Sequence, residues 1–164
     1  MNQISNVVGL VAGLLSGAGG LQANIDALAT AESVPDITLG SQQVIAQNLP
    51  AEIAERNTPG KYPCVLVYFD EVANRLREKS RTFSGTAGMA IEARVSSDRV
   101  EDLDAQLNVL ADAIIRTLDQ NRGDWGDGIF FGGEYKISFA AVKHGGKNFT
   151  QTAKVTFTLD VSRN

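Results

Sequence analysis

The feature that most constrains this chain is one long amphipathic helix, which the sequence predicts over residues 98–120. Its apolar side chains recur at helical spacing and form a single stripe: Val100, Leu103, Leu107, Leu110, Ile114 and Leu118. Asp98 and Glu101 have the spacing of a capping box at the start of the helix. Because the stripe must be buried against a second layer, the segments on either side of the helix decide the fold class.

Those neighbouring segments have the composition and alternation of β-strands. Residues 62–72 and 86–95 precede the helix, and residues 128–142 and 150–161 follow it. Alternate apolar side chains face inward: Ala87, Met89, Ile91, Ala93, Val95, Val155, Phe157, Leu159 and Val161. The other face carries polar side chains, among them Thr86, Glu92 and Arg94. The pattern predicts an α+β fold, a mostly antiparallel four-stranded sheet with two main helices packed on one face.

The start of the chain holds an uncharged apolar stretch, VVGLVAGLLSGAGG, at residues 7–20. It is shorter than the roughly 20 apolar residues that a membrane-spanning helix needs. It also lacks the Lys and Ser or Thr that close a phosphate-binding loop. Helical spacing instead predicts an N-terminal helix within residues 1–32, which can resume after Gly20, and no association with a membrane. Gly9, Gly13 and Gly17 share one side of this helix, which predicts close approach of another backbone.

Residues 33–61 differ from the rest of the chain because they hold three of its four prolines. Prolines interrupt regular structure, so this part is predicted to be an extended arm with a short strand at 44–46 and a helical turn at 51–56. We therefore expect a single domain over residues 1–164, with the order α-β-β-α-β-β and its β-β-α-β-β core in residues 62–164.

The composition limits the chemistry that the chain can carry. One cysteine, Cys64, excludes an internal disulfide and a multi-cysteine metal site, and one histidine, His144, excludes a mechanism that needs two. The net charge of −4 does not favour binding to DNA or to anionic membranes. Without a nucleophile–base pair or a phosphate loop, the sequence predicts no enzyme activity, no catalytic residue, no cofactor and no metal ion.

A basic stretch stands out, NRLREKSRTFSG at residues 74–85. It has a cation at every second residue: Arg75, Arg77, Lys79 and Arg81. If the stretch is an extended arm that continues the hairpin, all of these charges lie on one face. The stripe is then either a solvated edge or a dock for an acidic surface, including that of a second copy. Nucleic acid is less favoured, because no aromatic residue alternates with the charges, although Phe83 is close.

Two further loops are candidate contact regions. Trp125 lies between Asp124 and Asp127, where it is either a packing residue or an interface contact, and the spacing of a calcium loop is missing. The sequence HGGKN at residues 144–148 predicts a turn between the last two strands. The complete set of candidate contact residues is Arg75, Arg77, Lys79, Arg81, Phe83, Trp125, His144, Lys147 and Asn148.

Two long segments, together with the helix between them, resemble the tail terminator (tail completion) proteins of long-tailed bacteriophages. They are KYPCVLVYFDEVANRLREKSRTFSGTAGMAIEARVSSDR and WGDGIFFGGEYKISFAAVKHGGKNFTQTAKVTFTLDV. The matching features are Tyr-Pro before the first strand, a Lys/Arg-rich connection that ends in Phe-Ser-Gly, Ser-x-Asp-Arg before the helix, and Gly-Gly-Lys-Asn-Phe before the last strand. The resemblance covers roughly residues 60–162, and none of its motifs has a catalytic rationale.

The resemblance implies a structural role. Such proteins form a ring, usually of six copies, that caps the tail tube, stops its polymerisation and meets the head connector or head-completion protein. DNA passes through the lumen without sequence-specific binding, and the ring becomes part of the virion after assembly in the host cytoplasm. Another neck protein of the same fold and a small-molecule-binding regulatory α+β domain stay open as alternatives, and an enzyme is the least favoured.

Overall fold

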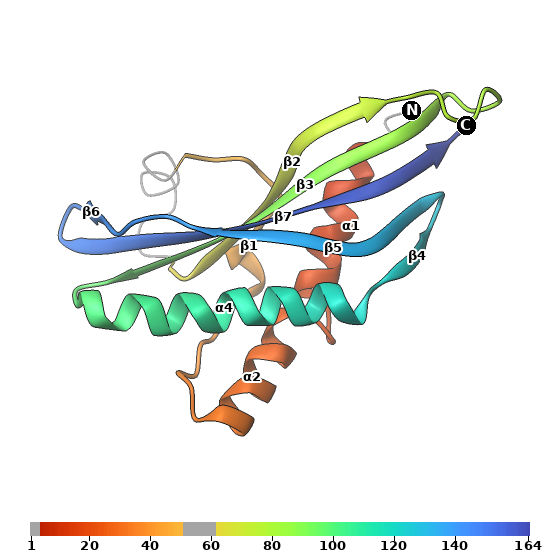
Figure 1. Cartoon of the computed structure of the whole chain (residues 1–164). Coiled ribbons are helices and arrows are strands. Elements are labelled where there is room, and N and C mark those ends of the chain that lie inside the picture. Colours follow the sequence, from red (N-terminus) through yellow and green to blue (C-terminus); the bar gives the residue numbers. More distant parts are fainter. Residues whose placement is uncertain (1–3, 51–61) are drawn as a thin grey trace.

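The computed structural model describes residues 4–50 and 62–164, and its elements are arranged as Figure 1 shows. Two helices come first, α1 (Ser5–Ser16) and α2 (Leu21–Glu32). A short 3-10 helix (Ser41–Gln43) and strand β1 (Val44–Ile45) follow. The remaining elements are β2 (Cys64–Asn74), β3 (Phe83–Ser97), α4 (Val100–Gln120), β4 (Gly123–Gly126), β5 (Ile129–Phe139), β6 (Lys143–Gly145) and β7 (Asn148–Arg163).

The strands form one seven-stranded sheet with the order β1-β2-β3-β7-β5-β4, and β6 pairs with β7. Every pairing is antiparallel except that of β1 with β2. The predicted α+β class is therefore confirmed, and β2, β3, β5 and β7 are the four strands that the sequence predicted. The predicted four-stranded sheet is wrong in detail, because β1, β4 and β6 also join it. These strands have 2, 4 and 3 residues, too few to display an alternation.

The described part of the predicted arm runs along α2 before it enters the sheet. The Gln22 side chain holds it there, since its Nε2 donates to the Ile37 carbonyl at 3.0 Å and its Oε1 accepts from the Leu39 N–H at 2.8 Å. Ile37 is buried against the core. The short strand predicted near residues 44–46 is confirmed as β1, whereas the helical turn predicted at 51–56 lies outside the described residues.

The N-terminal region forms two separate helices of 12 residues each rather than one. The chain leaves the helical conformation at Gly17, whose ψ is 174°. Gly20 fits the tight connection that follows, because a Cβ at this position would lie 2.2 Å from the carbonyl oxygen of Leu15. The stretch Asn6–Glu32 has a mean hydropathy of 1.3 and is, by length and composition alone, long and apolar enough to cross a membrane. In the structure it is divided between the two helices, and its buried side chains pack in the core.

The glycine row of α1 has no neighbour within the described chain. A Cβ at Gly9 or Gly13 would meet nothing within 4 Å, and all three glycines of the row are exposed. The prediction that another backbone approaches this side is therefore not met inside one copy.

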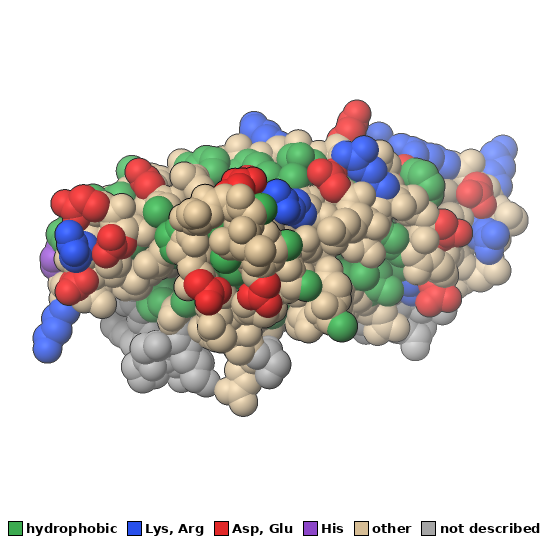
Figure 2. All heavy atoms as spheres, turned by 90° about the horizontal axis from the view of Figure 1, so that it is seen from below, with side chains coloured by type: hydrophobic (Ala, Val, Ile, Leu, Met, Phe, Trp, Pro, Cys, Tyr) green, Lys and Arg blue, Asp and Glu red, His purple; other side chains and the backbone are tan. Residues whose placement is uncertain are grey.

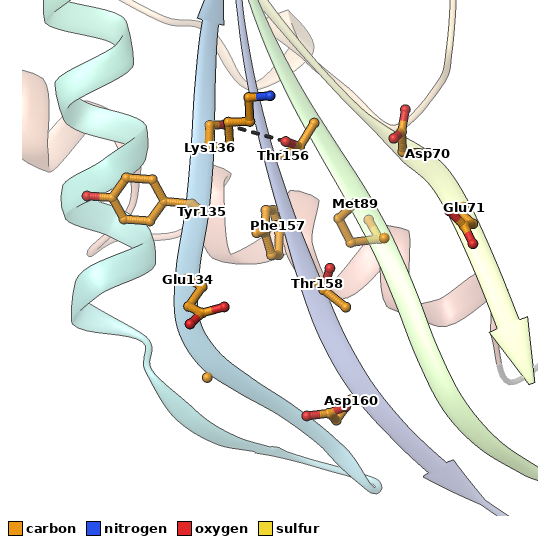
Figure 3. A pocket seen from close by; sticks show the side chains of 12 residues that line it. Asp70, Glu71, Met89, Glu134, Tyr135, Lys136, Thr156, Phe157, Thr158 and Asp160 are labelled. Carbon is orange, nitrogen blue, oxygen red and sulfur yellow. Dashed lines mark hydrogen bonds between the residues drawn. The ribbon is translucent and has the colours of Figure 1, made fainter. Parts of the chain in front are cut away.

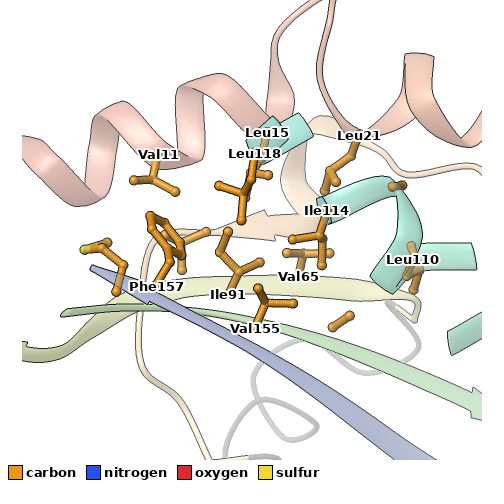
Figure 4. Close-up of a cluster of buried hydrophobic side chains, with 14 of the residues drawn as sticks. Val11, Leu15, Leu21, Val65, Ile91, Leu110, Ile114, Leu118, Val155 and Phe157 are labelled. Carbon is orange, nitrogen blue, oxygen red and sulfur yellow. The ribbon is translucent and has the colours of Figure 1, made fainter. Parts of the chain in front are cut away.

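The core lies between the helices and one face of the sheet, as Figure 4 shows. The inward-facing residues predicted for β3 and β7 are all buried. From α4, Leu103, Leu107, Leu110, Ile114 and Leu118 are buried as well. Burial of such a side chain contributes about 1.5–3 kcal/mol before the cost of conformational entropy. The apolar stripe of α4 thus packs on the inward-facing side chains of β3 and β7.

The start of α4 differs from its prediction. The helix begins at Val100 with Arg99 as the N-cap, and no side chain caps it, so the predicted capping box of Asp98 and Glu101 is wrong. The Ser97 hydroxyl accepts the N–H of Arg99 at 3.1 Å, which places the turn one residue later than the sequence suggested. Val100 is 43% exposed, so it does not belong to the buried stripe.

A buried amide joins the N-terminal helices to α4. Asn24 Nδ2 donates to the Gly20 carbonyl and to Thr117 Oγ1, both at 3.0 Å. Gln120 Nε2 donates in turn to Asn24 Oδ1 at 3.1 Å. A buried polar group that finds its partners in this way fixes the relative position of two helices.

We predict that Leu110→Ala lowers the free energy of unfolding by about 2–5 kcal/mol, because Leu110 is fully buried and its loss leaves a cavity. Val100→Ala is the matched control and should change the free energy of unfolding by less than about 0.5 kcal/mol. Urea denaturation measures both. Equal effects would contradict a buried stripe that begins at Leu103.

Candidate assembly surfaces

The helices cover one face of the sheet, and the second face is only partly covered. A small cluster of Cys64, Leu66, Tyr68 and Ala90 lies on that second face and packs against Ile45, Leu49 and Tyr62 from the chain before β2. The sequence predicted a polar, solvated face, but around Cys64, Leu66 and Tyr68 this face is covered by apolar side chains. No described residue covers the remainder of this face.

Glu92 is the centre of a polar network at the edge of this cluster. Tyr68 Oη donates to Glu92 Oε2 at 2.7 Å, and Arg94 forms an ion pair with Glu92 Oε1 at 2.9 Å. Arg94 Nη2 also donates to the Leu49 carbonyl at 2.6 Å. The Arg94 side chain is only 7% exposed, so it holds the arm on the sheet and is not a solvated surface charge.

Three groups around this network have shifted pKa values. Burial raises the pKa of the Cys64 thiol to about 11, although the Arg94 charge opposes the shift. Burial, and then the hydrogen bond to Glu92, raises the pKa of Tyr68. The hydrogen bond from Lys154 to Asp70, 3.0 Å long, raises the pKa of Lys154. The thiol is therefore a protonated packing group at neutral pH, not a nucleophile.

A shallow groove of about 660 Å³ crosses the open part of the sheet from β2 to β5. Figure 3 shows Asp70 and Glu71 on one side of it and Glu134 on the other, while Tyr135 points away toward α4. Threonines of β7 form its floor. Such an open, charged lining suits contact with another polar surface better than it suits enclosure of a small ligand.

The basic stretch forms a turn, which corrects the predicted two-stranded arm. Residues 75–82 lie between the end of β2 and the start of β3 and have no strand pairing. Arg77 pairs with Asp160 at 3.3 Å, and Arg81 pairs with Glu78 at 3.2 Å. Arg75 and Lys79 are exposed and form no ion pair with a described residue. The four charges therefore do not form one stripe.

The other candidate contact residues are divided between the two ends of the sheet (Figure 1). Trp125 of β4 lies at the end that holds the basic turn; its ring packs 5.6 Å from that of Phe131, and its Nε1 donates to the Asn121 carbonyl. Phe83 is half-buried against the core.

The hairpin of β6 and β7 lies at the opposite end, with exposed His144, Lys147 and Asn148. Gly146 supplies the positive φ of 75° that its turn requires. The His144 ring stands edge-on to Phe149 at 5.4 Å. The structure therefore brings the basic turn and the Trp125 region together, and keeps the hairpin apart from both.

Sequence reasoning missed the margin of the sheet along β5. β4 pairs only with Ile129–Phe131, and no described strand pairs with the outer edge of residues 132–139. Phe130, Tyr135 and Phe139 are 48%, 37% and 52% exposed. Figure 2 shows hydrophobic side chains along the upper rim of the molecule, interspersed with charged ones, and others across the same face. An open strand edge lined with exposed aromatic residues is a surface that tends to acquire a partner.

The sequence IFFGGEYKISF of β5 holds one feature that could have indicated an edge strand. Its Gly132-Gly133 pair interrupts the alternation, and the register of β5 on β7 shifts between Phe131 and Tyr135. Such an irregularity is typical of an edge strand.

A scan against known protein-family models finds no match for this chain, and a search of curated protein sequences finds none either.

We predict that the Cys64 thiol makes stability fall as the pH rises from 9.0, its ordinary pKa, to about 11. In this window the unfolded thiol has lost its proton and the folded thiol retains it, so the free energy of unfolding decreases by about 1.4 kcal/mol per pH unit from this group. Denaturant titrations on both sides of the window should show a shallower fall in Cys64→Ala, which keeps Tyr68 and Lys154. Identical slopes in the two proteins would contradict the shift.

Proposed function

We propose that the chain is a structural protein of the phage tail. In this proposal, copies form a ring, six in the family that it resembles, at the head-proximal end of the tail tube. The ring stops polymerisation of the tube and offers its other face to the head connector or head-completion protein. It is part of the virion after assembly in the host cytoplasm, and it works through surface contact, not through a reaction.

The open margin of β5 is the observation that carries this proposal. Exposed Tyr135 and Phe139 lie along residues 132–139 of β5, the part of the strand that has no described neighbour on its outer side. Monomeric proteins usually protect such an edge, so its exposure supports a chain that associates with others. The resemblance of the motif order to tail terminators is the reason for proposing that this association takes place at the phage tail.

The charges of the open sheet face are compatible with passage of DNA. Asp70, Glu71, Glu134 and Asp160 border the groove, and Lys136 is the one cation among the described residues that line it. DNA binding by counterion release requires Lys and Arg at the phosphates. If this face borders the lumen of the ring, DNA meets a surface on which it can slide.

We predict that the purified protein forms particles with a mass near six times 17.5 kDa, either alone or when it is mixed with tail tubes. Light scattering measures the mass, and electron microscopy shows whether one end of each tube is capped. Tubes assembled in its presence should also stop growing. A strict monomer under both conditions, with tubes of unlimited length, would overturn the proposal.

We predict that the triple variant Arg75→Glu, Arg77→Glu, Arg81→Glu folds but does not assemble. These side chains are exposed, and the exposed ion pairs of Arg77 and Arg81 are each worth about 0–1 kcal/mol, so thermal unfolding should change little. A control with Arg99→Glu and Arg116→Glu reverses charges on the helical side. Sedimentation should show that the control assembles and the triple variant does not. Normal assembly of the triple variant would contradict a role of the basic turn in assembly.

A further inference from the structure

We propose that the copies in the ring join edge to edge, with residues 133–139 of β5 in one copy antiparallel to residues 68–74 of β2 in the next. This joint rests on the proposed ring and adds the two surfaces that meet. The occupant of each edge is a second copy of this chain, because the chain carries both members of the complementary pair.

Both edges are open in the single copy. β1 pairs with β2 only at Val65 and Leu66, and no described strand lies on the outer side of residues 67–74. At the other margin, β4 pairs with β5 only as far as Phe131. Within the described residues, each edge therefore presents backbone groups without a strand partner to a neighbour.

The directions of the two strands fit a ring. β2 pairs antiparallel with β3, β3 with β7, and β7 with β5, so β2 and β5 run in opposite directions. Rotation about an axis along the strands preserves these directions. β5 of one copy therefore meets β2 of the next in the antiparallel sense, and the contact repeats head to tail until the ring closes.

The short strands at the ends of the two edges do not obstruct this pairing. In an antiparallel pair, the start of one strand lies beside the end of the other. β4, which blocks the start of β5, falls beyond Asn74 of the neighbour. β1, which blocks the start of β2, falls beyond Phe139 of the first copy. The two free edges between these blocks are equal in length.

The faces of the strands set the register, first through two apolar side chains. Tyr135 pairs with Phe157, and Val72 pairs with Ala87, within one copy. Phe157 and Ala87 are both buried under the helices, so Tyr135 and Val72 face the same side. They are 37% and 40% exposed in one copy, and placing them opposite each other buries both.

The same register then pairs opposite charges on the open face. Lys136 follows Tyr135 and lies opposite Glu71, which precedes Val72. Both line the open groove in one copy. Asp70 already binds Lys154 at 3.0 Å within its own chain, whereas Glu71 forms no ion pair with a described residue. Lys136 therefore meets an acid that is free to receive it.

The joint also places the basic turn, residues 75–82, beside an acidic loop of the neighbouring copy. The end of β2 and the start of β5 lie together, so residues 75–82 of one copy come beside the β4–β5 turn of the next. Asp124 of β4 and Asp127 of the turn are exposed, as are Arg75 and Lys79. The two loops carry opposite charge, which steers this pairing.

A two-fold pairing of β5 with β5 is less compatible with the structure. An axis through Tyr135 would also place Glu134 opposite Lys136. It would, however, bring Phe139 opposite Phe131 of the other copy, where β4 already occupies the edge. It would also leave β2 open and close a dimer instead of a ring.

Cysteine cross-linking tests the joint in a Cys64→Ala background. With Tyr135→Cys and Val72→Cys in one chain, mild oxidation should give a disulfide-linked ladder that ends at the ring on a non-reducing gel. A mixture of the two single variants should give linked dimers only, and neither single variant should link alone. Tyr135→Cys with Val100→Cys is the control, since Val100 is 43% exposed but lies on α4, and it should give no ladder.

Charge reversal provides an independent measurement. Lys136→Glu and Glu71→Lys should each weaken association about tenfold, and the two together should restore it to within about threefold of the wild type. Rings of the expected mass with no ladder and no charge rescue overturn the joint and leave the ring. Linkage of Tyr135→Cys alone, or to tube protein, assigns the edge to another partner and overturns the joint. Monomers with and without tubes overturn the ring and the joint together.

Discussion

Burial of a single face of the sheet beneath the helices is the constraint on which the rest of the structure depends. α4 packs on β3 and β7, α1 packs beside it on β1 and β2, and α2 packs chiefly against α4. Leu110 and Ile114 lie above the central strands, where Ile91 and Val155 complete the contact. A helical layer of this width covers the middle of the sheet more fully than its margins. The exposure of Tyr135 and Phe139 is a direct consequence, since they pair with Phe157 and Ala153 on the helical side but lie beyond the helices.

The parts of the fold that follow from local periodicity could be predicted from the sequence. Apolar side chains recur with the period of a helix from Leu103 to Leu118 and with the period of a strand from Ala87 to Val95. Their burial could therefore be predicted. Val100 fits the same period and is nevertheless exposed, because it is the first residue of the helix and follows closely on the end of β3. The close approach of Gly20 to the Leu15 carbonyl leaves no room for a Cβ, and the apolar spacing does not reveal such a contact.

The candidate site was predictable only in part, for similar reasons. The alternating cations of residues 75–81 indicate a stripe if the chain is extended, but Asn74 closes the segment into a turn. Its Oδ1 accepts the N–H groups of Leu76 at 3.2 Å and Ser84 at 3.1 Å. Such local side-chain bonds compete with strand pairing. The β5 margin was missed because Tyr135 and Phe139 continue an inward alternation, and their exposure is set by the width of a layer formed by distant residues.

Both free edges carry irregularities that make indiscriminate pairing unfavourable. The register of β2 on β3 shifts between Phe69 and Glu71, and β5 has its shift beside Gly132 and Gly133. Bulges and charges of this kind protect edge strands from aggregation, because a flat foreign strand cannot follow them. A partner with one Lys at the matching position meets the acid at Glu71, whereas a generic apolar strand would bury that acid without compensation. In the proposed joint, edges built in this way favour the one neighbour whose irregularities and charges complement their own.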